Sequence, residues 1–225
     1  MMYNITKPKD GANEPLPGRG RLITLEGIDG TGKTTQIASL SASLRERGIT
    51  VLELREPGGT VIGEAIRQIL LDNKHSGMSD ETELLLFTAA RAQSVREVML
   101  PALASGTWII CDRFLDSTLA YQGYGRGMDL ATINSINGFA VDGCRPDITI
   151  LLDLPVEAAI SRLGSRQGKA DRLDGESRAF MQRTRDGYLA AAAHEPNRII
   201  VINAEQSAAD LAKNIFNTIW EDLGI

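Results

Sequence analysis

Short apolar runs alternate along the chain with longer segments in which apolar residues recur at helical spacing. The runs are rich in Ile, Val and Leu and lack polar alternation, which is typical of strands buried on both faces of a parallel sheet. They lie at residues 21–26, 50–55, 108–112, 147–154 and 198–203. This alternation predicts an α/β fold, with a five-stranded parallel sheet, helices on both faces, and ligands at the carboxyl ends of the strands.

The segments between the runs carry helix start and stop signals. Segment 34–48 ends in a glycine, whereas segments 80–100 and 208–224 follow Ser79 and Ser207, which are candidate N-caps. Each of these segments is therefore predicted to be a helix.

Length and composition favour one domain behind an N-terminal arm. Residues 1–20 are polar, rich in Pro and Gly and without periodicity, so we expect a flexible arm followed by a single domain at 21–225. The net charge of −5 argues against a nucleic-acid partner, because such binding needs a broad basic surface. No apolar run approaches the roughly 18 residues of a membrane span, and no signal peptide is recognisable, which predicts a cytoplasmic protein without a membrane partner.

Neither cysteine nor histidine indicates a metal or disulfide site. Cys111 and Cys144 form no C-x-x-C pair, and Cys111 falls inside an apolar run. His75 and His194 lie far apart in the sequence and lack the spacing of a metal motif.

The stretch EGIDGTGKTTQ follows the first apolar run directly and opens the first helical segment. It fits G-x-x-x-x-G-K-[ST], in which backbone N–H groups cradle phosphates, the Lys reaches the β and γ oxygens, and the Thr hydroxyl binds Mg²⁺. A glycine-rich turn would explain the glycines but not the Lys and Thr. The stretch therefore predicts a site for a nucleoside triphosphate and Mg²⁺. The candidate nucleotide-binding residues are Gly27, Ile28, Asp29, Gly30, Thr31, Gly32, Lys33, Thr34 and Thr35.

The apolar run at 108–112 ends in Asp112, which fits a carboxylate that helps hold Mg²⁺ at the phosphates. Any buried strand can end in Asp, so this signal is weak alone. Arg113 follows immediately, and a cation beside the metal carboxylate is suited to bind an acceptor phosphate or to neutralise charge during transfer.

Two further arginines are candidates for an acceptor site. Arg55 ends a predicted strand before a Pro-Gly-Gly turn, which would aim its side chain at the carboxyl edge of the sheet. Phe87 and Arg91 are spaced i and i+4, which places an aromatic ring and a guanidinium on one side of a helix. A solvated Arg55 and a core Phe87 are the alternatives.

The segments LEGIDGTGKTTQ, REPGGT, LLFTAARAQ, ICDRFLDSTLAYQG, PDITILLDLP and ADRLDGES resemble bacterial thymidylate kinases in order and spacing, over roughly residues 20–222. The resemblance implies the P-loop nucleoside monophosphate kinase fold with a small lid, and a homodimer. It also implies that ATP phosphorylates dTMP to dTDP with Mg²⁺, in dTTP synthesis for DNA replication.

The resemblance also assigns roles to individual residues. Phe87 would stack on thymine, Arg91 would bond the edge of the base, and Tyr121 would lie near the sugar and disfavour a ribose. Arg55 and Arg113 would hold the dTMP phosphate. Asp29 would accept from the 3′-hydroxyl, Thr34 and Asp112 would serve Mg²⁺, and Ser117, Thr118 and Gln122 would complete the substrate site.

A catalytic cation is missing from the variable positions of the P-loop. Some thymidylate kinases carry an Arg at the place of Gly30, and others supply the cation from a lid, so the resemblance implies the second kind here. The expected lid spans 162–175, and its cations are Arg162, Arg166, Lys169 and Arg172. Arg166 is the first candidate, so that the expected catalytic residues are Lys33, Asp112, Arg113 and Arg166. The alternative is a solvated loop.

Two other functions remain as alternatives. A kinase of the same architecture could use another acceptor, such as dUMP, dCMP or a deoxynucleoside. A GTP-dependent switch would need the guanine-reading pattern N-K-x-D, but Asn73 and Lys74 are followed by Ser76 where Asp is required.

Overall fold

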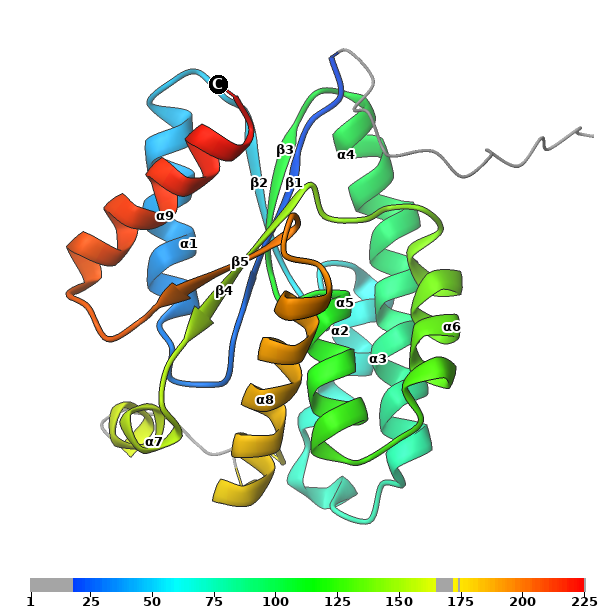
Figure 1. Ribbon diagram of the computed structural model, residues 1–225. Helices are drawn as coiled ribbons and strands as arrows, with labels where there is room; N and C mark the ends of the chain where they lie inside the picture. The colour runs from blue at the N-terminus through cyan, green and yellow to red at the C-terminus, as the bar shows by residue number, and fades with distance from the viewer. Residues whose placement is uncertain (1–17, 165–171, 174, 225) are drawn as a thin grey trace, which may run out of the picture.

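The five strands form one parallel sheet, as predicted, in the order β2-β3-β1-β4-β5. The computed structural model describes residues 18–164, 172–173 and 175–224 (Figure 1). The strands are β1 (Leu22–Glu26), β2 (Val51–Arg55), β3 (Trp108–Asp112), β4 (Ile148–Asp153) and β5 (Ile199–Asn203). With β1 in the centre, the loop that follows β1 opens in the middle of the carboxyl edge, between the ends of β3 and β4.

Helices cover both faces of the sheet. In Figure 1, α1 and α9 lie on one side, and α3, α4, α6 and α8 lie on the other. No described helix is both long and apolar enough to cross a bilayer. The helices are α1 (Lys33–Arg45), α2 (Val61–Leu71), α3 (Asp80–Ser94), α4 (Leu100–Ala104), α5 (Leu115–Thr118), α6 (Leu130–Val141), α7 (Val156–Gly164), α8 (Arg178–His194) and α9 (Ala208–Asp222).

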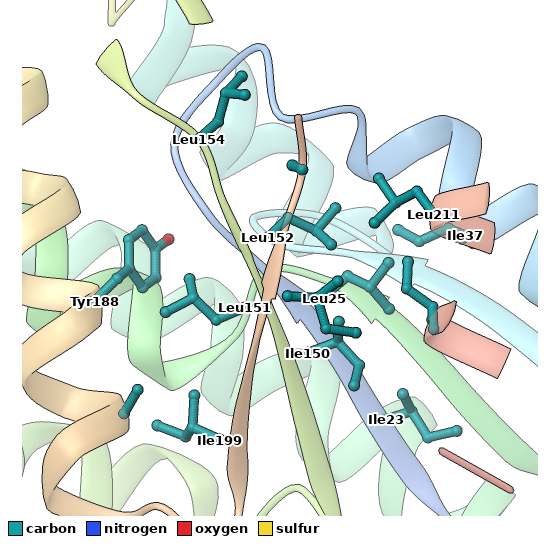
Figure 2. Close-up of a cluster of buried hydrophobic side chains, with 14 of the residues drawn as sticks. Ile23, Leu25, Ile37, Ile150, Leu151, Leu152, Leu154, Tyr188, Ile199 and Leu211 are labelled. Carbon is teal, nitrogen blue, oxygen red and sulfur yellow. The ribbon is translucent and has the colours of Figure 1, made fainter. Parts of the chain in front are cut away.

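The core lies on both sides of the central strands because successive strand residues point to opposite faces. Figure 2 shows Leu151 directed toward Tyr188 of α8, and Leu152 directed toward Ile37 of α1 and Leu211 of α9. All three of these helix side chains are buried. Because β1, β3 and β4 are packed on both faces, the carboxyl edge of the sheet is a rigid base for the loops above it.

Two details of the predicted elements are wrong. The edge strands β2 and β5 are only partly buried, and Val201 is 44% exposed, because each edge strand has a neighbour on one side only. Segment 80–100 is not one regular helix: α3 ends at Ser94, residues Val95–Met99 form a π-helical segment, and α4 follows.

The N-terminal boundary also needs correction, because part of the expected arm belongs to the domain. Arg19 forms an ion pair with Asp147, and the Gly20 N–H donates to the carbonyl of Leu103 at 2.8 Å. Gly20 is buried so tightly that a Cβ there would lie 1.9 Å from the carbonyl oxygen of Thr107. Residues 18–20 are therefore structured, and residues 1–17 lie outside the described part of the chain.

Substituting Gly20 tests this boundary. Gly20→Ala is expected to lower the free energy of unfolding by about 1–3 kcal/mol, because backbone must move to admit the methyl group. The control is Gly138→Ala on the exposed face of α6, where a Cβ meets no heavy atom within 4 Å. That variant is expected to gain about 0.5–1 kcal/mol from helix propensity. Urea unfolding measures both, and an unchanged midpoint in Gly20→Ala would contradict the corrected boundary.

Candidate active site

A cavity of about 690 Å³ opens at the carboxyl edge of the sheet, above β1, β2 and β3. It is lined by the P-loop and the start of α1, by the loop after β2, and by α3, the residues after β3, and α7. The cavity brings together residues that the sequence analysis drew from separate motifs. These are Asp29, Gly30, Gly32, Lys33, Thr34, Thr35, Arg55, Phe87, Arg91, Asp112, Arg113, Ser117, Thr118, Tyr121, Gln122 and Arg162.

Not every P-loop residue faces this cavity. The side chain of Ile28 is in the hydrophobic core, and Thr31 is fully buried with its hydroxyl donating to the carbonyl of Ile28. Lys33 donates from Nζ to the carbonyls of Gly27 and Ile28 at 3.0 and 3.1 Å. Burial and the neighbouring Arg113 lower the pKa of Lys33 to about 8, so the ammonium stays charged at neutral pH.

Gly30 explains why the P-loop carries no cation at that position. Its φ is +89°, a conformation that side chains rarely adopt, and a Cβ would lie 2.6 Å from the carbonyl oxygen of Ala159 in α7. An arginine at position 30 would therefore require both the loop and α7 to move. The P-loop of this structure therefore has no room for a cationic side chain at position 30.

Arg113 is the most connected side chain of the site. Its Nη2 donates to Asp29 at 2.7 Å and to the hydroxyl of Tyr121 at 3.0 Å. Its Nη1 donates to the carbonyl of Gly27 and to the hydroxyls of Tyr188 and Ser117. The residue has φ +68°, a strained backbone of the kind found at functional sites. Desolvation in the cavity opposes ionisation of Asp29, but Arg113 and Lys33 outweigh it and hold the pKa of Asp29 below its usual range.

The residues predicted to serve Mg²⁺ fit such an ion. Oδ1 of Asp112 is buried and accepts no hydrogen bond from any residue that the structure describes. Burial of an unpartnered carboxylate oxygen is costly unless a cation or a water binds it. Asp112 and Thr34 both line the cavity, Thr34 at the N-terminal turn of α1. Oxygen ligands of this type suit Mg²⁺, which keeps several of its waters.

Arg91 is not the free side chain that its helical spacing with Phe87 suggested. It is 2% exposed and donates from Nε to Glu56 at 2.7 Å, and from Nη1 to Thr118 and Asn137 at 2.8 and 2.6 Å. Its Nη2 donates to the carbonyl of Phe114. Arg91 thus forms a fixed part of the cavity wall.

Arg55 and Phe87 remain accessible in the cavity. The side chain of Arg55 is 46% exposed, and its guanidinium donates to Glu64 at 2.9 Å and to the carbonyl of Pro57 at 3.1 Å. Arg67 also donates to that carbonyl and lines the cavity. Two arginines therefore meet at the loop after β2, of which the sequence indicated only Arg55.

The expected lid is described in part. Arg166 and Lys169 lie outside the described residues. Arg162 belongs to the last turn of α7, lines the cavity, and donates to the carbonyl of Ala204. Arg172 is a correction: it does not line the cavity, and its guanidinium donates to the carbonyl of Leu70 and, at 2.6 Å, to the buried Glu83. In this structure Arg172 therefore forms an ion pair with Glu83 and does not face the cavity.

The sequence analysis missed the buried carboxylates behind the cavity wall. Glu26, at the end of β1, accepts from the N–H of Phe114 and from the hydroxyls of Ser117 and Tyr188. Burial and the nearby Asp116 raise the pKa of Glu26 to about 7, against the lowering effect of Arg113. A glutamate at the end of an apolar run was the available signal, but the run does not reveal which distant donors would meet it.

Comparisons with known proteins agree with this geometry. The family model for thymidylate kinase matches residues 25–215. The chain belongs to the thymidylate kinase family. It is 47% identical to the thymidylate kinase of Alcanivorax borkumensis, over 90% of this chain and 97% of that protein. It is 50% identical to that of Desulforudis audaxviator, over 88% and 89% of the two chains, and 48% identical to that of Geobacter sulfurreducens, over 89% and 98%.

The raised pKa of Glu26 predicts how stability depends on pH. Between about pH 4.5 and 7 the folded protein holds a proton on Glu26 that the unfolded chain has lost. Its contribution to the free energy of unfolding therefore falls by roughly 3 kcal/mol as the pH rises through this window. Urea unfolding at pH 5 and pH 8 is expected to show this loss in the native protein and not in Glu26→Gln.

An exposed carboxylate provides the control. Glu221→Gln on α9 is expected to keep the pH dependence of the native protein, because this side chain lies at the surface. If the free energies of unfolding of the native protein and Glu26→Gln differ by the same amount at pH 5 and pH 8, the pKa of Glu26 is not raised by folding.

Proposed function

We infer that the chain transfers the γ-phosphoryl group of ATP to dTMP and so produces ADP and dTDP. One observation supports this beyond family membership: a single cavity joins a complete P-loop to an aromatic side chain, Phe87, and to arginines that do not belong to the P-loop. A triphosphate donor and a nucleotide acceptor can therefore meet end to end in one cavity. Positioning and electrostatic stabilisation are the main sources of rate in such a transfer.

We propose for the residues that line the cavity the roles that the family resemblance implies. On the donor side, the P-loop backbone and Lys33 bind the phosphates. Thr34 and Asp112 would hold Mg²⁺, which when bound neutralises charge on the phosphates. On the acceptor side, Phe87 stacks on the base and Arg55 and Arg113 bind the phosphate. Asp29 lies between the two sides and, once Arg113 engages a ligand, can accept from a sugar hydroxyl.

An acceptor panel tests the proposed function. ADP release is measured with ATP, Mg²⁺ and each of dTMP, dUMP, dCMP, dGMP and AMP, and dTMP is expected to give the highest kcat/KM. Highest activity with another acceptor would favour the rival kinase. Nucleotide turnover that dTMP does not change would favour a GTP-dependent switch, although Asn73–His75 forms a short 3₁₀ helix and does not line the cavity.

Arg113 provides a test of the acceptor phosphate site. Arg113→Ala is expected to weaken dTMP binding by about 10- to 100-fold, because hydrogen bonds to charged groups contribute about 1.5–3 kcal/mol each. Thymidine, which lacks the phosphate, should lose little affinity. Calorimetric titration measures both, and Arg145→Ala, whose exposed guanidinium pairs with Glu195 away from the cavity, is the control. Equal losses of affinity for dTMP and thymidine would show that Arg113 does not bind the acceptor phosphate.

We also propose that Arg166 supplies the catalytic cation. A side chain at position 30 would be strained by the positive φ and would clash with α7. Arg172 is paired with Glu83, which leaves Arg162, Arg166 and Lys169 of the four lid cations. Arg162, in the last turn of α7, lines the same cavity as the P-loop.

Arg166→Ala is expected to lower kcat by at least about 10²-fold with little change in the KM for dTMP, as for an interaction made in the transition state. Steady-state kinetics measures this. Arg178→Ala, an exposed residue at the start of α8 paired with Glu157, should retain the native kcat. A near-native kcat in Arg166→Ala would transfer the role to Arg162 or Lys169.

A homodimer, which the resemblance implies, is our proposal for the assembly. Apolar side chains are exposed on α2, α3 and α6, including Val61 at 87%, Leu85 at 55% and Phe139 at 80%. These helices lie on the same side of the sheet in Figure 1. Analytical ultracentrifugation tests the assembly, and a monomer at micromolar concentration would reject it. The cytoplasmic location remains a prediction from the sequence.

A further inference from the structure

Glu83 is a buried carboxylate of α3 that lies behind the acceptor end of the cavity. It accepts a hydrogen bond from Nε2 of Gln122 at 3.0 Å, from Nε and Nη2 of Arg126 at 3.2 Å each, and from Nη2 of Arg172 at 2.6 Å. Burial opposes ionisation, but these hydrogen bonds outweigh it and lower the pKa of Glu83. Glu83 is therefore a carboxylate that only accepts hydrogen bonds.

The ionised carboxylate fixes which way the amide of Gln122 points. Because Glu83 offers no donor, only the NH₂ end of the amide can face it, and a reversed amide would place two acceptors against each other. Gln122 is 3% exposed, lines the cavity, and receives no hydrogen bond at Oε1 from any described residue. The carbonyl oxygen is thus the polar atom that remains for a ligand.

Arg91 also lines the cavity, and its guanidinium offers only hydrogen-bond donors. Four of its five N–H groups donate to Glu56, Thr118, Asn137 and the carbonyl of Phe114. The second N–H on Nη2 has no acceptor among the residues that the structure describes. Thr118, which accepts from Arg91, lies four residues before Gln122. Arg91 and Gln122 both line the cavity, so its wall offers one donor and one acceptor, each held by buried partners.

We propose that Glu83 is a positioning residue for acceptor selection, which holds the Gln122 amide so that the cavity favours a 4-oxo pyrimidine over a 4-amino pyrimidine. A 4-oxo pyrimidine carries an acceptor at position 4 and a donor N–H at N3, which match Arg91 and Gln122. A 4-amino pyrimidine reverses both groups and leaves buried polar atoms unpaired. The proposal rests on the proposed function, because it deepens the description of the acceptor site.

The test compares dUMP and dCMP, which differ only at N3 and position 4 of the base, as competitive inhibitors of dTMP phosphorylation. In the native enzyme the inhibition constant of dCMP is expected to exceed that of dUMP by about 10²-fold or more. Glu83→Gln provides a group that can donate or accept, so the Gln122 amide can turn over. The ratio of the two constants is expected to fall at least about tenfold.

Two further variants separate positioning from general damage to the acidic cluster. Arg126→Gln breaks an ion pair of Glu83 but leaves the carboxylate facing Gln122, so it should keep the native ratio within about twofold. Gln122→Met removes the amide and should lower the ratio as Glu83→Gln does, and the double variant Glu83→Gln/Gln122→Met should lower it no further.

The outcomes are distinct. An unchanged ratio in Glu83→Gln, or an equal fall in Arg126→Gln, overturns the proposal. If Glu83→Gln does not fold, an unchanged ratio in Gln122→Met overturns it, because the amide then has no part in selection. Failure of the native enzyme to phosphorylate dTMP would instead reject the proposed function.

Discussion

The hydrogen bonds of the Arg113 guanidinium connect the parts of the active site more than any other single interaction. This side chain joins the P-loop, through Asp29 and Gly27, to the segment after β3 and to Tyr188 of α8. These bonds hold the guanidinium at the cavity before a substrate arrives. Its position follows from the parallel sheet, because β1 and β3 are neighbours and their carboxyl ends open side by side.

Buried carboxylates fix the polar side chains of the cavity from behind. Glu26 orders the hydroxyls of Ser117 and Tyr188 that contact Arg113, Glu56 holds Arg91, and Glu83 holds Gln122. Each is costly to bury, and removal of one partner leaves an uncompensated polar group. The benefit is that the groups facing a ligand are already oriented, as binding and catalytic sites require.

Much of the fold could be predicted from the sequence because its signals are local. The five apolar runs became the five strands, and Ser79 and Ser207 cap α3 and α9 as expected. The predictions that were wrong depend on where a segment lies in the folded structure. Nothing in the runs shows that β2 and β5 would be edges, and nothing in residues 18–20 shows that Gly20 would pack against Thr107.

For the site, the sequence by itself determined the chemical groups, since the P-loop, Asp112 and Arg113 each adjoin a strand end where short-range rules apply. Only the tertiary structure decided how those groups are used. From the sequence, Arg91 was expected at the edge of the base and Arg172 in the lid, and the structure binds both to buried carboxylates from other segments, Glu56 and Glu83. These pairs join residues 35 and 89 positions apart. Spacing along one helix or loop carries no information about such partners, because the packing of the folded chain brings them together.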